Sequence, residues 1–430
     1  MTYTVFWFRR DLRVEDNHGL FQALSGKNKV LPIFIFDKEI LDKLEDKKDP
    51  RLEFIISRLK SINEILKKHK SSIYILHDKP INALKKIIKE FKIEKVICNN
   101  DYEPYSLKRD SQIKHFLDEN GVKLESYKDQ VIFEKNEIVK NDQSPYVVYT
   151  PYSNKWIANF DPSMVESFPS EQLLDNVVSK TFAFINIETL GFKKSTIEIP
   201  PPVFSKNLID NYGKHRNFPA LNSTSKLGIY LRFGVFSIRE IIKKAKKSSD
   251  ITFLKELIWR EFFMQILWHF PHTTDASFKS KYDKIVWRNS SLEFARWCKG
   301  ETGYPIIDAG MRELNTTGFL HNRVRMLVAS FLCKHLLIDW RWGERYFAKK
   351  LLDYELSSNV GNWQWASGSG VDAAPYFRIF NPSEQTKKFD SNLKYIRKWV
   401  PEFEELNYVE KIVDHKFARE RCLSTYKKYL

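Results

Sequence analysis

The sequence has 430 residues, 43% of them hydrophobic and 29% charged, which is typical of a soluble globular protein with more than one core. Its longest apolar runs reach only seven residues, which excludes a membrane-spanning helix, and the N-terminus shows no signal-peptide pattern. The four cysteines are scattered and fit neither a disulfide framework nor a zinc site. We therefore expect reduced thiols, no bound metal and a cytoplasmic protein.

The net charge is strongly positive. Lysine and arginine total 70 and aspartate and glutamate total 54, so the formal net charge is +16. Such an excess favours a polyanionic partner, DNA or RNA, because neutralising phosphates releases condensed counterions. The many lysine pairs, such as Lys67-Lys68 and Lys243-Lys244, are equally typical of a basic surface without a bound partner. Charge alone leaves both interpretations open.

Residues 1–128 alternate short β-branched or aromatic runs with amphipathic stretches. The expected parallel strands are Val5–Phe8, Val30–Phe36, Ile73–Leu76 and Val96–Cys98. The expected helices are Arg51–His69, Ile81–Phe91 and Ser106–Asn120. This alternation predicts an α/β domain with a doubly wound parallel sheet. The domain contains neither a dinucleotide fingerprint nor a P-loop, so any nucleotide-like cofactor is expected elsewhere.

The periodicity of hydrophobic residues changes after residue 128. Residues 129–199 have weak periodicity and several prolines, which predicts an interdomain connector on the surface. From residue 200 to residue 430 the periodicity is helical, which predicts an all-α domain, and nine of the eleven tryptophans lie there. Tryptophans in a helical domain are usually core residues, but this density also fits a flat aromatic ligand.

One candidate site lies on the predicted helix Phe253–Phe270. Helical spacing places Glu256, Trp259 and Arg260 on one face. They fit two interpretations, an ion pair beside a core tryptophan, or a site where a nucleic-acid base stacks on the indole and donates to the carboxylate.

A second candidate is the helix predicted after Gly318. Its polar and flexible side chains lie on or beside an apolar face: Asn322, Arg323, Arg325 and Met326. Buried arginines require partners, for which Asp353 and Glu355 are the expected carboxylates. The arrangement fits a salt bridge between helices, with or without a cofactor between them.

The third candidate is the Gly- and Ser-rich stretch 357–382, SSNVGNWQWASGSGVDAAPYFRIFNP. Glycines in an ordered segment cost conformational entropy. We therefore interpret this stretch as a loop whose backbone closely approaches a ligand, rather than as packing alone.

Four motifs resemble the photolyase and cryptochrome family over nearly the whole chain. They are WFRRDLRVEDN at 7–17, TGYPIIDAGMRELNTTGFLHNRVRM at 302–326, DWRWGERYF at 339–347 and NWQWASGSGVDAAPYFRIFNP at 362–382. The resemblance implies an α/β antenna domain joined to a helical domain that binds flavin adenine dinucleotide (FAD), active in its reduced form. A second, antenna chromophore is possible. The run 102–106, YEPYS, departs from the folate motif and leaves folate, a deazaflavin, another flavin or none open.

The resemblance also assigns site residues by position. The FAD site comprises Tyr212, Thr224, Ser225, Lys226, Leu227, Gly228, Asn322, Arg325, Asp353, Glu355 and Asn359. The DNA and lesion site comprises Arg216, Glu256, Trp259, Arg260, Asn322, Arg323, Met326, Trp365 and Gln385. The electron relay comprises Trp363, Trp340 and Trp287. Two more catalytic roles are implied: protonated Glu256 stabilises the dimer radical anion, and Asn359 faces the redox nitrogen of the flavin.

The sequence departs from the family pattern at three further positions. Lys226 and Gly228 replace the commoner Arg and Ser of the flavin loop, and Phe319 stands where Trp is frequent. We expect slightly looser diphosphate binding from the first two and a packing adjustment around the third.

The implied function is light-dependent repair of cyclobutane pyrimidine dimers in double-stranded DNA, by electron transfer from photoexcited reduced FAD to a flipped-out dimer. Four positions favour a class I cyclobutane pyrimidine dimer photolyase: Asn322, Met326, Asn359 and Trp365. The first two are histidines in (6-4) photoproduct enzymes, the third is Asp or often Cys in cryptochromes, and the last is usually replaced in the DASH group.

Two other functions compete with repair, a cryptochrome-type blue-light photoreceptor without repair activity and a flavin-binding electron-transfer protein. We expect a monomer with no membrane attachment and no obligate protein partner. Binding to DNA is expected to associate it with the nucleoid.

Overall fold

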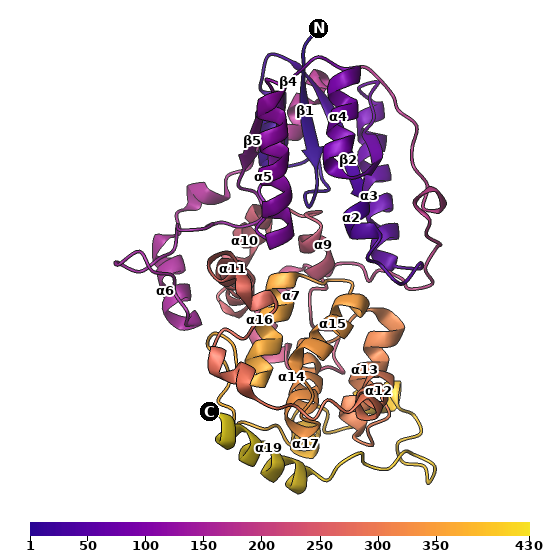
Figure 1. The fold of residues 1–430 in the computed structure, drawn as a ribbon, viewed down its shortest axis with the longest axis vertical. Helices are drawn as coiled ribbons and strands as arrows, with labels where there is room; N and C mark the ends of the chain where they lie inside the picture. The colour runs from indigo at the N-terminus through magenta and orange to yellow at the C-terminus, as the bar shows by residue number, and fades with distance from the viewer. The chain divides into compact units, whose positions relative to one another are not determined.

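The computed structural model describes residues 1–430, which form two compact units (Figure 1). Unit 1 consists of residues 1–137, 158–202 and 227–247, and unit 2 consists of residues 138–157, 203–226 and 248–430. Each unit is thus assembled from three separate stretches of chain. The expected domains at 1–128, 129–199 and 200–430 stay a prediction. None of the helices is long and apolar enough to cross a membrane.

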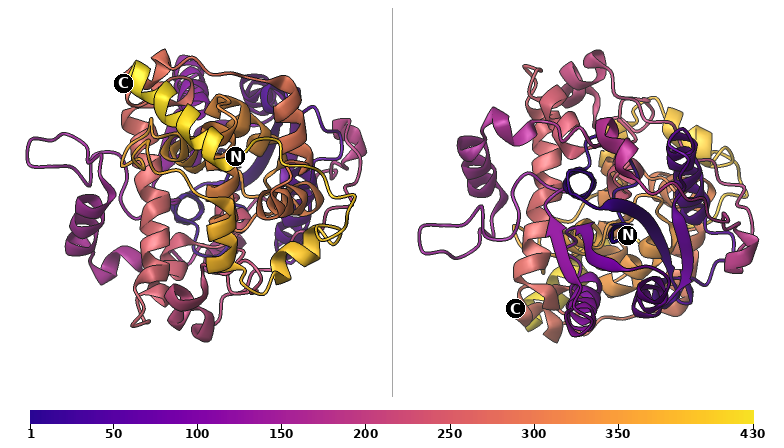
Figure 2. Two further views of the ribbon diagram at one scale, coloured as in Figure 1. Left: turned by 90° about the horizontal axis from the view of Figure 1, so that it is seen from below. Right: turned by 90° about the horizontal axis from the view of Figure 1, so that it is seen from above.

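The centre of unit 1 is a five-stranded parallel sheet in the order β3-β2-β1-β4-β5 (Figure 2). The strands are β1 (Tyr3–Phe8), β2 (Lys29–Asp37), β3 (Tyr74–Asp78), β4 (Ile93–Asn99) and β5 (Lys123–Tyr127). The expected doubly wound fold and its four strands are confirmed. The fifth strand, β5, was not predicted, because the short run KLESY carries no buried residue and forms the edge of the sheet.

Helices cover both faces of this sheet. The helices of unit 1 are α1 (His18–Leu24), α2 (Lys38–Leu41), α3 (Pro50–Lys67), α4 (Pro80–Glu90), α5 (Pro104–Glu119), α9 (Gly228–Arg232) and α10 (Ile238–Ala245), with 3-10 turns η1 (Pro162–Val165), η2 (Ser170–Asn176) and η3 (Glu188–Leu190). Phe6 and Phe8 of β1 pack into one apolar cluster with residues of α1 and α3. Val5 and Trp7 point to the opposite face and pack with residues of α4 and α5.

A buried ionic cluster joins the segment 227–247 to the sheet within unit 1. Asp129, whose side chain is 1% exposed, accepts hydrogen bonds from Arg13 at 2.7 Å and from Arg239 at 2.9 Å. Burial by itself raises the pKa of Asp129, but the two guanidinium groups outweigh it and the net shift is downward. Arg13 belongs to the motif WFRRDLRVEDN, so this part of the motif is structural.

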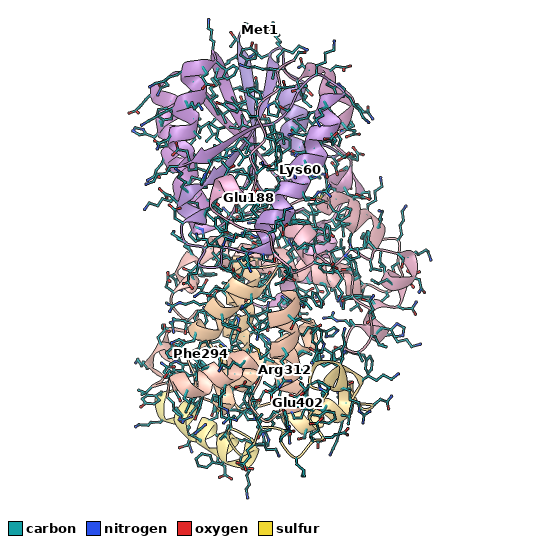
Figure 3. All side chains as sticks on the ribbon, turned by 90° about the vertical axis from the view of Figure 1, so that its right-hand side faces the viewer. Met1, Lys60, Glu188, Phe294, Arg312 and Glu402 are labelled. Atoms are coloured by element: carbon teal, nitrogen blue, oxygen red, sulfur yellow. The ribbon has the colours of Figure 1, made fainter.

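Unit 2 is helical, as expected. Its elements are α6 (Tyr149–Asn159), α7 (Lys206–Asp210), α8 (Tyr212–His215), α11 (Thr252–His269), α12 (Ser291–Lys299), α13 (Pro305–Thr317), α14 (Asn322–Ser330), α15 (Trp340–Lys350), α16 (Leu356–Ser367), α17 (Pro382–Phe389), α18 (Lys394–Trp399) and α19 (His415–Tyr429), with 3-10 turns η4 (Pro271–Thr274) and η5 (Ser280–Lys284) and a π-helical turn η6 (Phe331–His335). Arg312 of α13 forms an ion pair with Glu402 at 2.6 Å, beyond the end of α18 (Figure 3).

One expectation about local structure was wrong, and one segment contains a helix that the sequence did not predict. Residues 357–367 are not part of a loop, because they belong to α16. A Cβ atom at Gly361 would lie 2.2 Å from Cδ1 of Phe263, so this glycine lets α16 pack against α11 rather than approach a ligand. The segment predicted as a surface connector contains α6, whose Trp156 is 0% exposed.

The ionic cluster predicts a large effect for Asp129→Asn. The substitution removes the carboxylate that pairs with Arg13 and leaves Arg239 with Asp16 alone, so we expect unfolding to become easier by about 3–5 kcal/mol. Asp129 raises the free energy of unfolding at pH values above the usual pKa of a carboxyl group. This stabilisation is lost as the pH falls through the lowered pKa of Asp129. Thermal melting of the purified protein measures this loss.

The matched control is Asp175→Asn, because Asp175 pairs with His69 while its own side chain is 98% exposed. We expect a change below about 1 kcal/mol there. Equal effects of the two substitutions would contradict the role assigned to Asp129.

Candidate functional site

A pocket of about 600 Å³ lies in unit 2 among residues of α14, α15 and α16 and the segment before α16. Eight of the residues singled out from the sequence line it: Asn322, Arg325, Met326, Asp353, Glu355, Asn359, Trp363 and Trp365. The lining residues that sequence reasoning missed are Ala329, Phe347, Leu351, Tyr354, Ser358, Asn362 and Ala366. These are mostly small, aromatic or apolar side chains, which carry no chemical signal in a single sequence.

Helix α14 presents its polar face to this pocket because of the turn before it. Gly318 ends α13 with a φ of +65°, where a Cβ atom would lie 2.7 Å from Cγ of Leu352. His321 then caps α14, with Nδ1 accepting from the backbone N–H of Arg323 at 3.2 Å. From this start, helical spacing carries Asn322, Arg325 and Met326 to one wall.

The two arginines of α14 have different partners. Arg325 donates to both carboxylate oxygens of Asp353, at 2.9 and 3.1 Å, which is the expected pairing. Arg323 has no carboxylate partner, because its Nη2 donates to Asn217 at 2.6 Å and its guanidinium lies 4.3 Å from the ring centroid of Phe389. Its Nε is buried without a hydrogen-bond acceptor.

The amide of Asn359 is held by a residue to which the sequence analysis assigned no role. Its Nδ2 donates to the backbone oxygen of Glu344 at 3.1 Å and to Oε1 of the same residue at 2.9 Å. Burial raises the pKa of Glu344, and the hydrogen bond from Asn359 opposes that shift. The bonds orient the Asn359 amide, whose Oδ1 has no protein donor. Membership of the motif DWRWGERYF was the only sequence signal for Glu344.

The run 224–228 contributes surplus hydrogen-bonding capacity and positive charge. The hydroxyl of Thr224 is buried without a hydrogen-bond partner, and Nζ of Lys226 lies 3.5 Å from the ring centroid of Phe319. Lys226 and Phe319, two departures from the family pattern, thus form one cation–π pair. The backbone oxygen of Ser225 accepts a hydrogen bond from the backbone N–H of Val203 at 2.8 Å. The last two residues of the run, Leu227 and Gly228, belong to unit 1.

The remaining DNA-site residues group around α11 and α17. Glu256 forms an ion pair with Arg216, whose guanidinium also lies 5.5 Å from the ring of Tyr212. Trp259 and Arg260 follow on the same helix and are both half-buried. Gln385 of α17 has a buried Oε1 without a donor. Because Glu256 is ion-paired, its protonated form stays a prediction.

The three relay tryptophans do not form a continuous ring stack. Trp340 and Trp363 are 1% and 2% exposed, and Trp287 is half-buried. Trp363 contacts the rings of Trp297, at 6.2 Å between centroids, and of Phe347, at 5.0 Å. Sequence reasoning did not single out Trp297, because nothing in its local pattern separates it from the other tryptophans.

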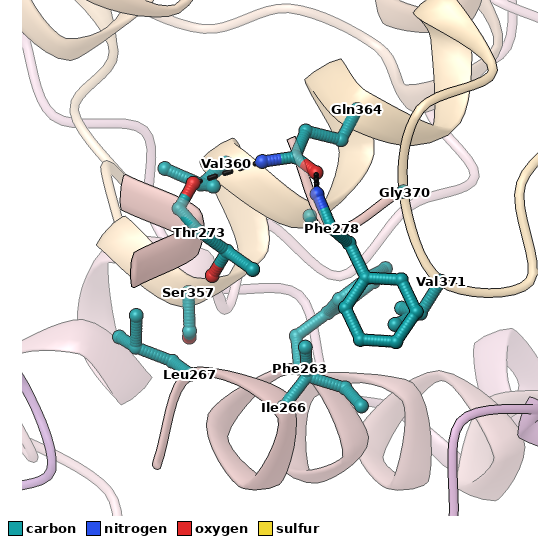
Figure 4. A pocket seen from close by; sticks show the side chains of 11 residues that line it. Phe263, Ile266, Leu267, Thr273, Phe278, Ser357, Val360, Gln364, Gly370 and Val371 are labelled. Carbon is teal, nitrogen blue, oxygen red and sulfur yellow. Dashed lines mark hydrogen bonds between the residues drawn. The ribbon is translucent and has the colours of Figure 1, made fainter. Parts of the chain in front are cut away.

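A smaller pocket lies between α11 and α16 (Figure 4). The amide of Gln364 crosses it, donating to the backbone oxygen of Thr273 at 2.8 Å and accepting from the N–H of Phe278 at 2.9 Å. The side chains of the run WQW therefore alternate, with Trp363 and Trp365 at the larger pocket and Gln364 at the smaller one.

Comparison with known proteins identifies relatives over the whole chain. Residues 4–172 match the family described as DNA photolyase, and residues 253–408 match the FAD binding domain of DNA photolyase. The deoxyribodipyrimidine photo-lyase of Halobacterium salinarum is 32% identical, over 99% of this chain and 98% of its own.

Two solved structures are similar in fold and sequence. A class III photolyase from Agrobacterium tumefaciens has a TM-score of 0.88 and 30% identity, covering 100% of this chain and 98% of its own. An archaeal photolyase from Sulfolobus tokodaii, described with two FAD molecules, has a TM-score of 0.85 and 34% identity, covering 99% and 100%.

His321 predicts a specific acid sensitivity of the site. Burial, together with the positive charges of Lys226 and Arg325, lowers the pKa of His321 to about 3. Below a pH of about 6.5 the unfolded chain binds a proton at this residue and the folded chain does not. The free energy of unfolding therefore decreases by up to about 1.4 kcal/mol for each unit by which the pH is lowered. Asparagine keeps a capping oxygen but does not titrate. We expect His321→Asn to melt with a shallower pH dependence between pH 6.5 and 5, and identical slopes for variant and wild type would contradict this.

Proposed function

This chain belongs to the DNA photolyase family, and we propose that it repairs cyclobutane pyrimidine dimers in double-stranded DNA with light. The observation that supports this most directly is the composition of the larger pocket. Cofactor-site residues Arg325, Asp353 and Asn359 line the same pocket as lesion-site residues Met326 and Trp365. A shared pocket supports repair because electron transfer requires a donor and an acceptor close together, whereas a photoreceptor without repair activity has no need of the lesion-site set.

The residues present fit FAD. A buried hydroxyl without a partner at Thr224, in the same run as the cationic Lys226, suits a diphosphate. The unbonded oxygen of Asn359 suits an N–H group of a flavin ring. Bound FAD supplies light absorption and one-electron transfer, which no side chain provides.

The chain's own residues bind and orient the damaged DNA. We assign base stacking to Trp259 and Trp365, contact with the dimer to Asn322 and Met326, and phosphate contact to Arg216. An approaching phosphate competes with Glu256 for Arg216, and we assign to the released Glu256 side chain, in its protonated form, a hydrogen bond donated to the dimer.

The finer assignments belong to the same proposal. Class I membership rests on Asn322, Met326, Asn359 and Trp365, although a class III enzyme is among the similar structures. We propose a monomer that works without an obligate protein partner, in the cytoplasm at the nucleoid, where its substrate lies. Besides FAD, a second light-harvesting chromophore is part of the proposal, and its identity stays open.

Illumination of defined DNA tests the repair function. We expect the purified protein with reduced FAD to remove a thymine dimer from a synthetic duplex in near-ultraviolet or blue light and not in the dark. A duplex with a (6-4) photoproduct serves as the specificity control and is expected to remain unrepaired. Persistence of the dimer under light, with the flavin verified as reduced, would contradict the proposal.

The relay predicts a separation of two activities in Trp363→Phe. Phenylalanine is much harder to oxidise than tryptophan, so light-driven reduction of the bound oxidised flavin should be lost, while repair by chemically reduced protein persists. Flavin absorbance during illumination, followed by the repair assay, measures both. Trp297→Phe is the matched control, because Trp297 contacts Trp363 but lies outside the assigned relay. Loss of photoreduction in the control alone would move the relay to Trp297.

A further inference from the structure

Helix α6 docks on α11 through three aromatic residues spaced along one face, Tyr149, Tyr152 and Trp156. The indole of Trp156 donates to Glu261 at 2.6 Å. The ring of Tyr152, which is 1% exposed, lies 5.1 Å from that of Phe262. The docking is thus well packed over two turns, although the sequence predicted only a connector here.

Tyr149 makes a different contact from the other two, because its ring lies flat on Trp259. The ring centroids are 3.6 Å apart and the planes differ by 6°, which is face-to-face contact of the whole ring. Trp259 also meets Phe263 at 5.4 Å and 28° and remains half-buried. One face of the indole is therefore covered by Tyr149.

Tyr149 itself is held firmly. It is 8% exposed, its hydroxyl donates to the backbone oxygen of Lys255 at 2.7 Å, and its backbone N–H donates to Asp372 at 3.2 Å. Arg216 and Glu256 lie close enough to influence its hydroxyl electrostatically. Tyr149 thus sits among the residues assigned to lesion binding, anchored at both ends.

We propose that Tyr149 is a positioning residue of the lesion site, which backs the indole of Trp259 and holds it ready to stack on a flipped-out base. The inference rests on the proposed function and adds Tyr149 to its binding machinery. A half-buried indole without such backing samples several orientations, and a base that stacks on it must then fix one of them. A ring already fixed by a buried partner avoids that loss of entropy on binding.

Removal of the aromatic ring tests the role of Tyr149. In Tyr149→Leu the side chain stays apolar but the stack is lost, and we expect the Kd for dimer-containing duplex to rise about 2- to 10-fold. Undamaged duplex, bound mainly through phosphates, is expected to keep its Kd. In steady-state repair by reduced protein, KM is expected to rise by the same factor while kcat stays unchanged.

Two further variants separate positioning from packing. Tyr149→Phe keeps the ring and loses only the hydrogen bond to Lys255, so dimer affinity is expected to stay within about twofold of wild type. Tyr152→Leu is the matched control, because Tyr152 supports the docking of α6 through its contacts with Phe262 and Glu261. It is expected to lower the melting temperature and leave the ratio of the two Kd values unchanged. Tyr149→Met supplies a second non-aromatic variant if leucine prevents folding.

Three results would overturn the inference. An unchanged ratio of the Kd values for dimer-containing and undamaged DNA in Tyr149→Leu would mean that Tyr149 is a packing residue only. Tighter binding of the dimer by that variant would mean that Tyr149 occupies the place of the base. Finally, a wild-type protein that neither prefers dimer-containing DNA nor loses a preference in Trp259→Ala would show that the lesion site itself is misassigned, which is a failure of the proposed function.

Discussion

The close packing of α16 against its neighbours determines the geometry of the larger pocket. Hydrogen is the only side chain that fits at Gly361, which faces Phe263 of α11, and at Gly343 of α15, where a Cβ atom would lie 2.1 Å from the ring of Trp363. These approaches let α16 carry Asn359, Trp363 and Trp365 to the pocket. Bulkier residues at the two glycines would separate the helices, because cores are packed too tightly to absorb added atoms.

Both units contain buried charges that are paired and buried polar atoms that have no hydrogen-bond partner. In unit 1 the buried charges pair with one another, as Arg13 and Arg239 do with Asp129. In unit 2 several buried polar atoms have no partner, among them Oγ1 of Thr224 and Nε of Arg323. Buried polar groups are almost always hydrogen-bonded in native proteins. Thr224 and Arg323 therefore keep hydrogen-bonding capacity that a ligand of unit 2 can use.

The tryptophans of unit 2 differ in burial and in the partners of their indole N–H groups. Trp156 and Trp297 are completely buried, and each donates its indole N–H to a protein acceptor, Glu261 and the backbone of Val328. Trp340 is equally buried, but its Nε1 has no acceptor. Trp259 and Trp365 keep part of their surface exposed. The exposed ring surface, rather than the abundance of tryptophan, is what suits them to stacking on bases.

Local patterns in the sequence were sufficient for the fold class and for one wall of the pocket. Alternation of strand and helix signals predicted the sheet, and helical spacing after Gly318 placed Asn322, Arg325 and Met326 together. Both are periodicities of neighbouring residues, which a single sequence contains. Tertiary structure alone decided that Gly361 serves packing, that Glu256 pairs with Arg216, and that Tyr149 covers Trp259. These partners are distant along the chain, and their meeting depends on how whole helices pack, which no local spacing encodes.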